Sequence, residues 1–361
     1  MSAAAPVLVR DARPEEYPAV GRLTERAFAH GPYGHLPVSA ARRELVHGVG
    51  VRAATGSVLV ATGADGALLG TASVLRHDSP HARLARAGEA ELRLLATAPE
   101  ARGRGIARAL ALAAQEDALA WGADALVLDT GTLNHASQRL YARLGYREFR
   151  PAATGGAAPE ASASTTGPDA DGGIDHLDFR LPLQPRADVV VRLARPDEVE
   201  EIAGLSLRAY EAAYELSAEY RASILDVGER VREHQVWVAA DAASGRLLGT
   251  VATPRRGRTI SPLARDGELD FRLLAVDPPA RGRGIGALLT RHAVELARLR
   301  GLDRVVMNSG EQMTGAHRLY ERLGFARLPE REHDLVVDGG RRIRLFAFSL
   351  DVPAERGSIA A

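Results

Sequence analysis

Short apolar runs alternate with helical patterns along the chain, and the same order occurs twice. In the first half, Val58–Ala61 and Leu68–Ala72 flank a turn at Asp65–Gly66 and predict a β-hairpin. In the second half, Val236–Ala239 and Leu247–Thr250 predict another. Each half is therefore expected to begin its central sheet in the same way.

A strand, a glycine-rich turn and a helix are expected after each hairpin. The strands are predicted over Leu92–Thr97 and Phe271–Val276, and prolines end them at Pro99 and Pro278. After the second turn, apolar residues lie on one helical face, at Ile285, Leu288, Leu289, Leu296 and Leu299. The pattern changes from strand to helix within a few residues of the glycines.

The last third of each half predicts a further strand, an amphipathic helix and a closing pair of strands. Buried strands are expected over Ala125–Leu128 and Arg304–Met307, and the helices should end at Gly145 and Gly324, because glycine adopts the left-handed C-cap conformation. The closing strands are expected at Leu177–Leu183 and Leu345–Leu350. The fold class is α+β, with a mixed central sheet flanked by helices in each of two tandem domains.

Direct repetition of sequence supports this duplication. Ala101–Ile106 recurs as Ala280–Ile285, and Leu69–Thr71 recurs at the same spacing as Leu248–Thr250. A period this long indicates duplicated domains rather than a solenoid.

The domains are expected at 1–184 and 188–353. The segment 151–173 is rich in Gly, Ala, Ser, Thr and Pro and lacks apolar periodicity, which predicts flexibility. Since the strand-like Leu177–Leu183 follows it, we expect an insertion within the first domain, and place the boundary at Pro182–Asp188.

Composition narrows the possible partners. Lys and Arg together number 46, as do Asp and Glu, and all 46 of the basic residues are arginine. The chain is therefore formally neutral and has no net positive charge that would attract nucleic acid or an anionic membrane. Cysteine is absent, which excludes disulfides and thiolate chemistry. The start of the chain lacks a secretory signal. We expect a cytoplasmic monomer with pseudo-two-fold tandem domains and a small-molecule partner.

The glycine-rich turns predict a pyrophosphate site. Glycines let several N–H groups converge, and a following helix adds the positive end of its dipole. A P-loop would need Gly-Lys, and a dinucleotide-binding fingerprint would need a third glycine where Arg108 and Ala287 stand. The residues expected at the turns are Arg102, Gly103, Arg104, Gly105, Ile106 and Ala107, and Arg281, Gly282, Arg283, Gly284, Ile285 and Gly286.

Strand, turn and later helix together resemble the GNAT superfamily of acetyltransferases, twice over nearly the whole chain. In the first copy the helix reads NHASQRLYARLGY from Asn134, similar to the family's Asn-x-x-Ala-x-x-Leu-Tyr-x-x-x-Gly-Phe, whereas Met313 takes the asparagine's place in the second. The resemblance implies acetyl-CoA as co-substrate and an asparagine bonded to its pantetheine arm. It also implies contacts with the strand residues Leu95, Ala96, Thr97, Leu274, Ala275 and Val276.

An acceptor amine arrives as ammonium at neutral pH and needs a base. The resemblance points to the start of the central strand, at Glu91 and Asp270, with Glu89 and Glu268 as alternates. Strand alternation also allows a plain ion pair between Glu91 and Arg93 on the same face.

The family places the acid that protonates the leaving thiolate at Tyr141 and Tyr320, although both are also compatible with simple packing. Histidines show no metal-ligand spacing, so no metal is expected.

The expected reaction is acetyl transfer to the primary amine of a small molecule by direct attack. Mycothiol synthases, a tandem group that the architecture resembles, and self-resistance to an amine antibiotic remain alternatives. In another class of function, one or both domains would bind acyl-CoA without catalysis.

Overall fold

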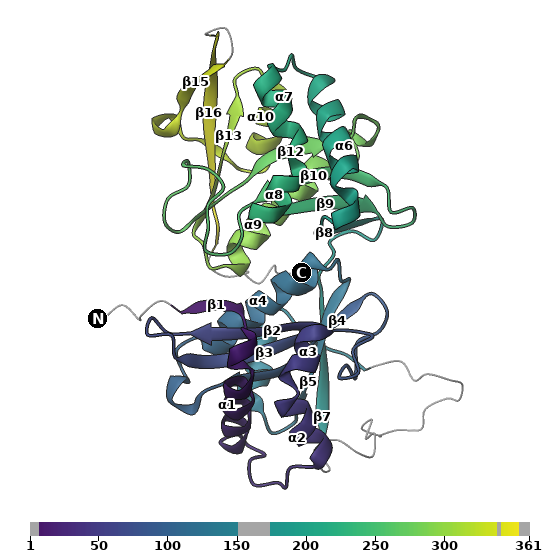
Figure 1. Cartoon of the computed structure of the whole chain (residues 1–361), viewed down its shortest axis with the longest axis vertical. Coiled ribbons are helices and arrows are strands. Elements are labelled where there is room, and N and C mark those ends of the chain that lie inside the picture. The colour runs from purple at the N-terminus through teal and green to yellow at the C-terminus, as the bar shows by residue number, and fades with distance from the viewer. Residues whose placement is uncertain (1–6, 151–173, 338–340, 354–361) are drawn as a thin grey trace. The chain divides into compact units, whose positions relative to one another are not determined.

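The computed structural model describes residues 7–150, 174–337 and 341–353. The backbone divides into two compact units, whose boundary in the sequence lies between Pro185 and Arg186 (Figure 1). The sequence-based limits, 1–184 and 188–353, stay predictions. The expected insertion at 151–173 lies outside the described residues.

The first unit contains seven strands and five helices among its described residues. The strands are β1 (Leu8–Asp11), β2 (Gly56–Thr62), β3 (Leu68–Arg76), β4 (Glu89–Thr97), β5 (Ala125–Gly131), β6 (Arg147–Glu148) and β7 (His176–Pro182). The helices are α1 (Tyr17–Ala29), α2 (Ala40–His47), α3 (Val49–Ala54), α4 (Ile106–Ala120) and α5 (His135–Arg143).

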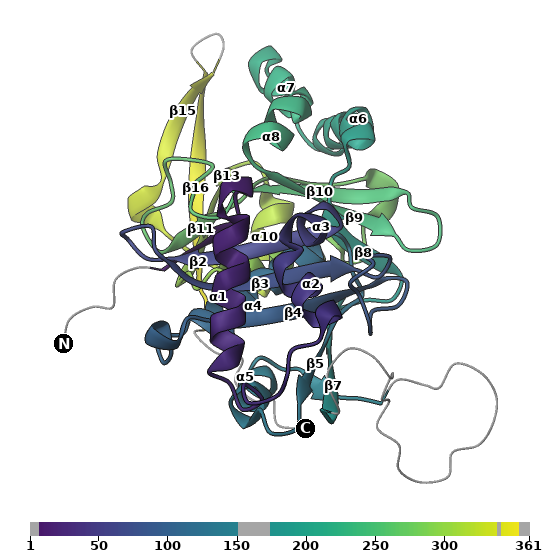
Figure 2. The ribbon, with the colours of Figure 1, turned by 60° about the horizontal axis from the view of Figure 1, so that its bottom comes forward.

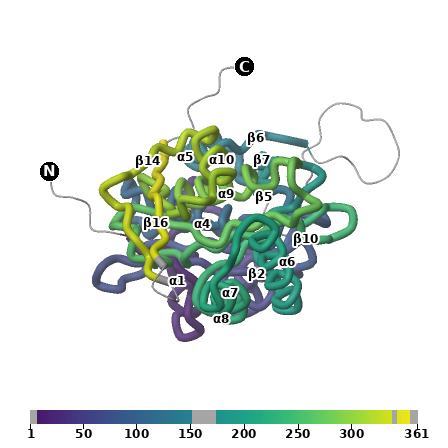
Figure 3. Tube along the Cα trace, turned by 90° about the horizontal axis from the view of Figure 1, so that it is seen from above, coloured from purple at the N-terminus to yellow at the C-terminus, as the bar shows by residue number. Residues whose placement is uncertain are grey.

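These strands form one mixed sheet in the order β1-β2-β3-β4-β5-β7-β6. Helices α1, α2 and α3 cover one face and α4 the other (Figures 1 and 2). The strands β5, β7 and β6 follow one another at one edge (Figure 3). The mixed sheet between two helical layers confirms the predicted α+β class.

The second unit repeats this order with its strands in two sheets. Its strands are β8 (Val189–Leu193), β9 (Gln235–Asp241), β10 (Leu247–Thr253), β11 (Glu268–Asp270), β12 (Arg272–Val276), β13 (Arg304–Gly310), β14 (Ala326–Arg327), β15 (His333–Val337) and β16 (Arg341–Asp351). Its helices are α6 (Val199–Glu211), α7 (Ala218–Leu225), α8 (Val227–Glu233), α9 (Ile285–Leu299) and α10 (Thr314–Arg322).

The central strand of the second unit is interrupted at Phe271, between β11 and β12. The prediction began this strand at Phe271, but the ring is buried against Tyr320 and Phe325, at centroid distances of 6.2 and 6.5 Å. One sheet runs β12-β10-β9-β8 and the other β11-β13-β16-β14, with β15 paired to β16.

The two central strands of the first unit pair over a short distance only. Parallel pairing of β4 with β5 covers Glu89–Glu91 and Ala125–Val127, while β5 stays paired to β7 as far as Gly131. Beyond Glu91 and Val127 the two strands are no longer paired, and we call the unpaired interval between them the opening. In the second unit the corresponding pairing ends at Asp270 and Val306.

A β-bulge lies directly beyond this divergence in each copy. Between the pairs Thr71–Ala96 and Ser73–Arg93, two residues of β4 face one of β3, and Leu94 has a φ of 53°. Leu273 has the same φ of 53° at the corresponding bulge. A leucine rarely adopts positive φ, and such backbone is concentrated at functional sites.

Candidate functional site

The glycine turns have the backbone that the sequence predicted. Gly103 and Gly105 have φ of 77° and 78°, and Gly282 and Gly284 have 81° and 77°. A Cβ atom would meet no atom within 4 Å at three of these positions, so the requirement is conformational rather than spatial. The turns lead directly into α4 and α9, whose first N–H groups lack helical partners.

A strand glycine brings each helix start close to the sheet. A Cβ atom on Gly70 would lie 2.7 Å from Ile106 Cγ2 and 2.8 Å from the carbonyl oxygen of Ala96. Gly249 is confined in the same way by Ile285 Cγ2, at 2.9 Å. The repeated Leu-Gly-Thr sequence is therefore the feature that positions the turn against the central strand.

The first arginine of each turn is already engaged by the protein. Arg102 donates from Nη1 and Nη2 to the carbonyl oxygens of His30 and Ala27, at 3.1 and 3.0 Å. Arg281 donates to the carbonyl oxygen of Ala209, at 2.7 Å. These arginines bind the C-terminal end of the first helix of their unit to the turn, which is a positioning role. Direct phosphate binding by Arg102 and Arg281 stays a prediction.

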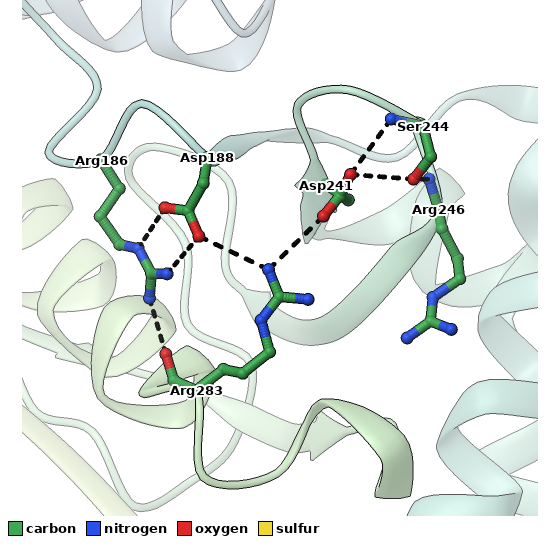
Figure 4. Close-up of polar contacts among 6 residues, drawn as sticks. All are labelled: Arg186, Asp188, Asp241, Ser244, Arg246 and Arg283. Atoms are coloured by element: carbon green, nitrogen blue, oxygen red, sulfur yellow. Dashed lines mark hydrogen bonds and ion pairs between the residues drawn. The ribbon is translucent and has the colours of Figure 1, made fainter.

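The second arginine differs between the copies. Arg283 Nη2 lies 3.5 Å from Asp188 Oδ2 and 3.4 Å from Asp241 Oδ2 (Figure 4). Asp188 also binds Arg186, and Nη1 of Arg186 donates to the carbonyl oxygen of Arg283 at 2.6 Å. Arg104 makes no ion pair with any described residue, so its charge is available at the first turn.

The strand segments next to the bulges face the openings. Leu95 and Thr97 are half-buried and Ala96 is buried. In the second unit Leu274 and Val276 are half-buried, and Ala275 is buried. Because a bulge turns backbone groups out of the ladder, N–H groups here can point toward a ligand rather than toward β3 or β10.

The two copies differ at the start of the later helix, as the sequence indicated. Asn134 is the N-cap of α5, and its Nδ2 donates to Thr130 Oγ1 at 3.2 Å. Met313 is the N-cap of α10 and packs against the apolar core that contains Tyr210 and Ala275. The first copy keeps an amide at this place and the second an apolar side chain.

Both candidate acids are buried tyrosines. Tyr141 packs on Tyr146 and Phe179, with centroids 5.6 and 6.0 Å apart, and Tyr320 packs on Phe325 at 5.9 Å. Burial raises the pKa of both hydroxyls, and the carboxylate of Asp129 adds to this for Tyr141. Both hydroxyls therefore remain protonated near neutral pH and can donate a hydrogen bond.

The candidate bases hold loops. Glu91 is fully buried, and its Oε2 accepts from the backbone N–H groups of Arg83, Leu84 and Ala85 at 2.7, 2.7 and 3.1 Å. Asp270 accepts from the backbone N–H of Ile260 at 3.1 Å and from Ser261 Oγ at 2.6 Å. Three backbone N–H groups therefore already occupy Oε2 of Glu91, and the carboxylate is engaged in holding the loop. This geometry argues against proton abstraction by Glu91.

The alternates are also paired. Glu89 Oε1 lies 2.9 Å from Arg180 Nε, and Glu268 forms a bidentate pair with Arg331 at 2.5 and 2.9 Å. Glu91 Oε1 lies 3.5 Å from Arg93 Nε. The Glu91–Arg93 pair that alternation allowed is present, although it is buried rather than on the surface.

One face of the first sheet carries charged side chains around the opening. Asp129 on β5 pairs in register with Asp178 on β7, and its carboxylate lies 2.5 Å from Arg83 Nη2 and 2.8 Å from His176 Nδ1. Asp178 makes no ion pair with any described residue. Burial raises the pKa of Asp178, and the neighbouring Asp129 raises it further.

Arg52 on α3 lies on the same face and is fully buried. It donates to Ser73 Oγ and, at 3.0 Å, to the carbonyl oxygen of Val46, and no carboxylate of a described residue pairs with it. Burial and, to a smaller extent, the neighbouring charge of Arg93 lower the pKa of Arg52 to about 10. The group still carries its charge at neutral pH.

The second unit lacks this arrangement. Asn308 and Ala347 occupy the register positions of Asp129 and Asp178. Arg230 takes the place of Arg52, and Asp226, the N-cap of α8, supplies a negative charge where the N-cap of α3 is Gly48.

Sequence reasoning missed Leu94, Arg52, Asp129 and Asp178. A bulge leaves no signal in an apolar strand. The aspartates had one, because each of their two strands contains an acid in the first copy where Asn308 and Ala347 stand in the second. Among the described residues, no group of three or more His, Asp or Glu is placed to hold a metal ion, and no helix is long and apolar enough to cross a membrane.

Comparisons with known proteins agree with this geometry. The sequence profile of the Acetyltransferase (GNAT) family matches residues 22–146 and 199–325. A mycothiol acetyltransferase of Nocardia farcinica is 31% identical over 273 residues, which are 73% of this chain and 77% of that protein. Glucosamine 6-phosphate N-acetyltransferase 1 of Oryza sativa subsp. japonica is 36% identical over 106 residues, which are 29% of this chain and 61% of that protein.

Among solved structures, the ribosomal-protein-S18-alanine N-acetyltransferase of Escherichia coli is 17% identical, with a TM-score of 0.35, and the match covers 48% of this chain and 99% of that one. Because the family profile matches each copy separately, the chain belongs to the GNAT family of acetyltransferases.

Proposed function

We propose that this protein is an acetyl-CoA-dependent N-acetyltransferase, and that its first unit transfers the acetyl group to the primary amine of a small molecule. The observation that carries the proposal is a repeated arrangement. A diverging strand pair, a bulge with a leucine at positive φ and a left-handed glycine turn at a helix start occur together in both copies. The turn suits the pyrophosphate of acetyl-CoA, and the opening suits its arm.

The chemistry requires one bond to form and one to break. The neutral amine attacks the thioester carbonyl carbon, negative charge gathers on the carbonyl oxygen, and the C–S bond then breaks. Backbone N–H groups at the Leu94–Leu95 bulge can stabilise that oxygen if they point to it. The amine loses a proton, and the departing thiolate gains one, for which Tyr141 is the candidate donor.

The first unit is the better equipped of the two. It alone has Asn134 at the helix start, an unpaired Arg104 at the turn and an unpaired carboxylate, Asp178, beside the opening among the described residues. In the second unit, Met313 and Ala347 take two of these places. The second unit is therefore proposed as a supporting copy that binds acetyl-CoA and turns over slowly or not at all.

The relatives support an amine acceptor without fixing its identity. The name of the rice enzyme states N-acetylation of an amino sugar phosphate. A second candidate is mycothiol acetyltransferase activity, which the Nocardia relative favours because its match extends over both copies. That acceptor would be a cysteinyl amine on an amino sugar.

Binding and turnover test the proposal separately. Calorimetry should show two acetyl-CoA sites per chain, and Gly105→Val and Gly284→Val should each remove one, because a β-branched residue is strained at positive φ. Each variant is the control for the other.

Release of CoA thiol with a panel of thiol-free amines then measures transfer, and the protein itself adds no thiol because it has no cysteine. Wild-type protein that binds no acetyl-CoA would refute the proposal.

A further inference from the structure

Arg93 and Asp178 lie on one face of the first sheet, which we call the acceptor face. Two charges on this face lack a partner of opposite sign among the described residues. One is a positive charge of the group formed by Arg52 and Arg93, and the other is the negative charge of Asp178. This face is the one that α1, α2 and α3 cover, because Arg52 of α3 donates to Ser73, the register partner of Arg93.

The two charges stand at the same level on either side of the opening. Arg93 lies two residues beyond Glu91, the last residue of β4 paired to β5. Asp129 lies two residues beyond Val127, the partner of Glu91, and Asp178 is its neighbour on β7. Because side chains two residues apart share a face of a strand, Arg93 and Asp178 lie on the same face with the opening between them.

The positive group carries one charge in excess. Arg93 is paired with Glu91 at 3.5 Å and donates from Nη1 to the carbonyl oxygen of His81 at 2.7 Å. Arg52 brings a second guanidinium, and its buried Nε has no hydrogen-bond partner among the described residues. Burial, and then these two arginines, lower the pKa of His81, as expected where the local potential is positive. An unpaired buried charge is costly unless an anion compensates it.

The second copy suggests a structural role for an arginine at this position, but that role alone explains Arg52 incompletely. Arg230 makes the equivalent tie, with donations to the carbonyl oxygens of Ser223 and Ile224 at 2.6 and 2.7 Å. There the carboxylate of Asp226 opposes the effect of burial on the pKa of Arg230. The first copy keeps the tie but has Gly48 at the position of Asp226, which leaves room for an anion supplied by a ligand.

We propose that the acceptor of the first unit is an amine that also carries an anionic group, a carboxylate or a phosphate, bound with that group at Arg93 and with its amine toward Asp178. The proposal rests on the proposed function and names the substrate class of the same site. Arg93 retains 11% of its side-chain exposure and meets the ligand, whereas Arg52 acts from behind it as a positioning residue. Asp178 attracts the ammonium and takes one proton from it, which frees the nitrogen lone pair for attack on the thioester carbon. The second proton leaves the nitrogen after the attack, as the C–S bond breaks, and replaces the one that Tyr141 gives to the thiolate.

Anion binding can be measured without knowing the natural acceptor. The protein is first saturated with CoA, so that both glycine turns are filled, and inorganic phosphate or acetate is then titrated by calorimetry. One further site is expected, and Arg93→Gln should weaken it by roughly 10-fold or more, since a charge-assisted hydrogen bond is lost. Arg272→Gln, the same change in the second copy, is the matched control and should leave it unaltered.

Matched acceptors provide the second arm. The value of kcat/KM is compared for glucosamine 6-phosphate against glucosamine, and for glycine against glycinamide. Wild type should prefer the anionic member of at least one pair by roughly 10-fold or more, and Arg93→Gln should lose most of that preference. Phosphate preference and carboxylate preference are read from the two pairs separately.

A variant that imitates the second copy keeps the test informative if Arg93→Gln unfolds. Gly48→Asp places a carboxylate at the position that Asp226 has in the second copy. Its Cβ atom would lie 2.8 Å from the backbone carbonyl oxygen of Glu44, so the end of α2 must shift to admit it. It should also weaken anion binding.

Absence of a further anion site in CoA-saturated wild type, or a site that both variants leave unchanged, would overturn the inference. Failure to bind CoA at all would instead refute the proposed function.

Discussion

Glu91 and Asp270 hold the same place in the two copies, and each carboxylate binds the loop that leads into its strand. The shared contact explains why an acid stands here in both units even though Asn134 and Asp178 have no counterpart of the same type in the second. A buried carboxylate that accepts several N–H bonds fixes the course of a loop, and this loop also carries Arg83, which pairs with Asp129.

Replacing Glu91 by glutamine should therefore act mainly on stability. The amide lacks the negative charge and turns an N–H₂ toward donors, so we expect unfolding of the first unit to become easier by about 3 kcal/mol. Asp270→Asn should have the corresponding effect on the second unit. Urea unfolding measures both. Unchanged stability together with lost turnover in Glu91→Gln would restore Glu91 as the base.

Removal of the Tyr141 hydroxyl should slow the first unit. Because a thiol of pKa about 8.5 can leave without help, Tyr141→Phe is expected to reduce kcat by ~10²-fold, the low end for general acid catalysis, with acetyl-CoA affinity preserved. Tyr320→Phe is the matched control and should change kcat less. The reverse order in side-by-side assays would assign catalysis to the second unit.

The rise of transferase activity with pH at the acidic end of the profile, its acid limb, should reflect deprotonation of Asp178. Burial and the charges of Asp129 and Glu91 raise its pKa, while Arg83 and His176 oppose the shift. Only the deprotonated carboxylate accepts a proton, so activity should rise with pH through a pKa above the ordinary value of about 4.

Asp178→Asn should remove this limb and lower kcat/KM by ~10²-fold. Glu148→Gln, on the exposed strand β6, is the control and should keep the limb. An unaltered profile in Asp178→Asn would exclude the residue as the base.

A single methyl group at Gly70 should disturb the first acetyl-CoA site. The added carbon would lie 2.7 Å from Ile106 Cγ2 and must push the start of α4 away from the sheet. We expect Gly70→Ala to destabilise the first unit by about 1–3 kcal/mol and to weaken acetyl-CoA binding there.

Gly204→Ala is the control for this change, because its methyl group would face only the mobile end of Arg208 at 3.2 Å, and alanine favours the helix. Calorimetry measures acetyl-CoA affinity in both variants, and only Gly70→Ala should show a loss. Equal acetyl-CoA affinity in Gly70→Ala and wild type would contradict the positioning role.

Most of the fold was predictable because its signals are local. The expected strand at Leu92–Thr97 is the end of β4, the strand at Ala125–Leu128 is the start of β5, and Gly145 ends its helix with a φ of 89°. Apolar periodicity and glycine conformation depend on a few neighbouring residues, so both can be recognised in a single sequence. Duplication gave each pattern a second, independent instance.

The contacts of the site were less predictable because they join distant segments. Arg102 matched a phosphate-binding motif, yet its guanidinium binds carbonyl oxygens at the end of α1. Glu91 occupied the place of a base, yet its partners are loop N–H groups that no spacing rule identifies. Residue type and position indicated where chemistry could occur, but not which polar partners each side chain had already acquired.

The contact between Arg186 and the turn at Arg283 limits how the chain can be cut. Arg186 follows the last residue of the first unit, and Asp188 lies two residues later, before β8 begins. A fragment that starts at Val189 would retain the described strands and helices from β8 onward but lose Arg186 and Asp188, two of the side chains that contact Arg283 of the turn. Dissection of the two activities therefore has to begin the second fragment at or before Arg186, or a weakened acetyl-CoA site will be mistaken for an intrinsic property of that copy.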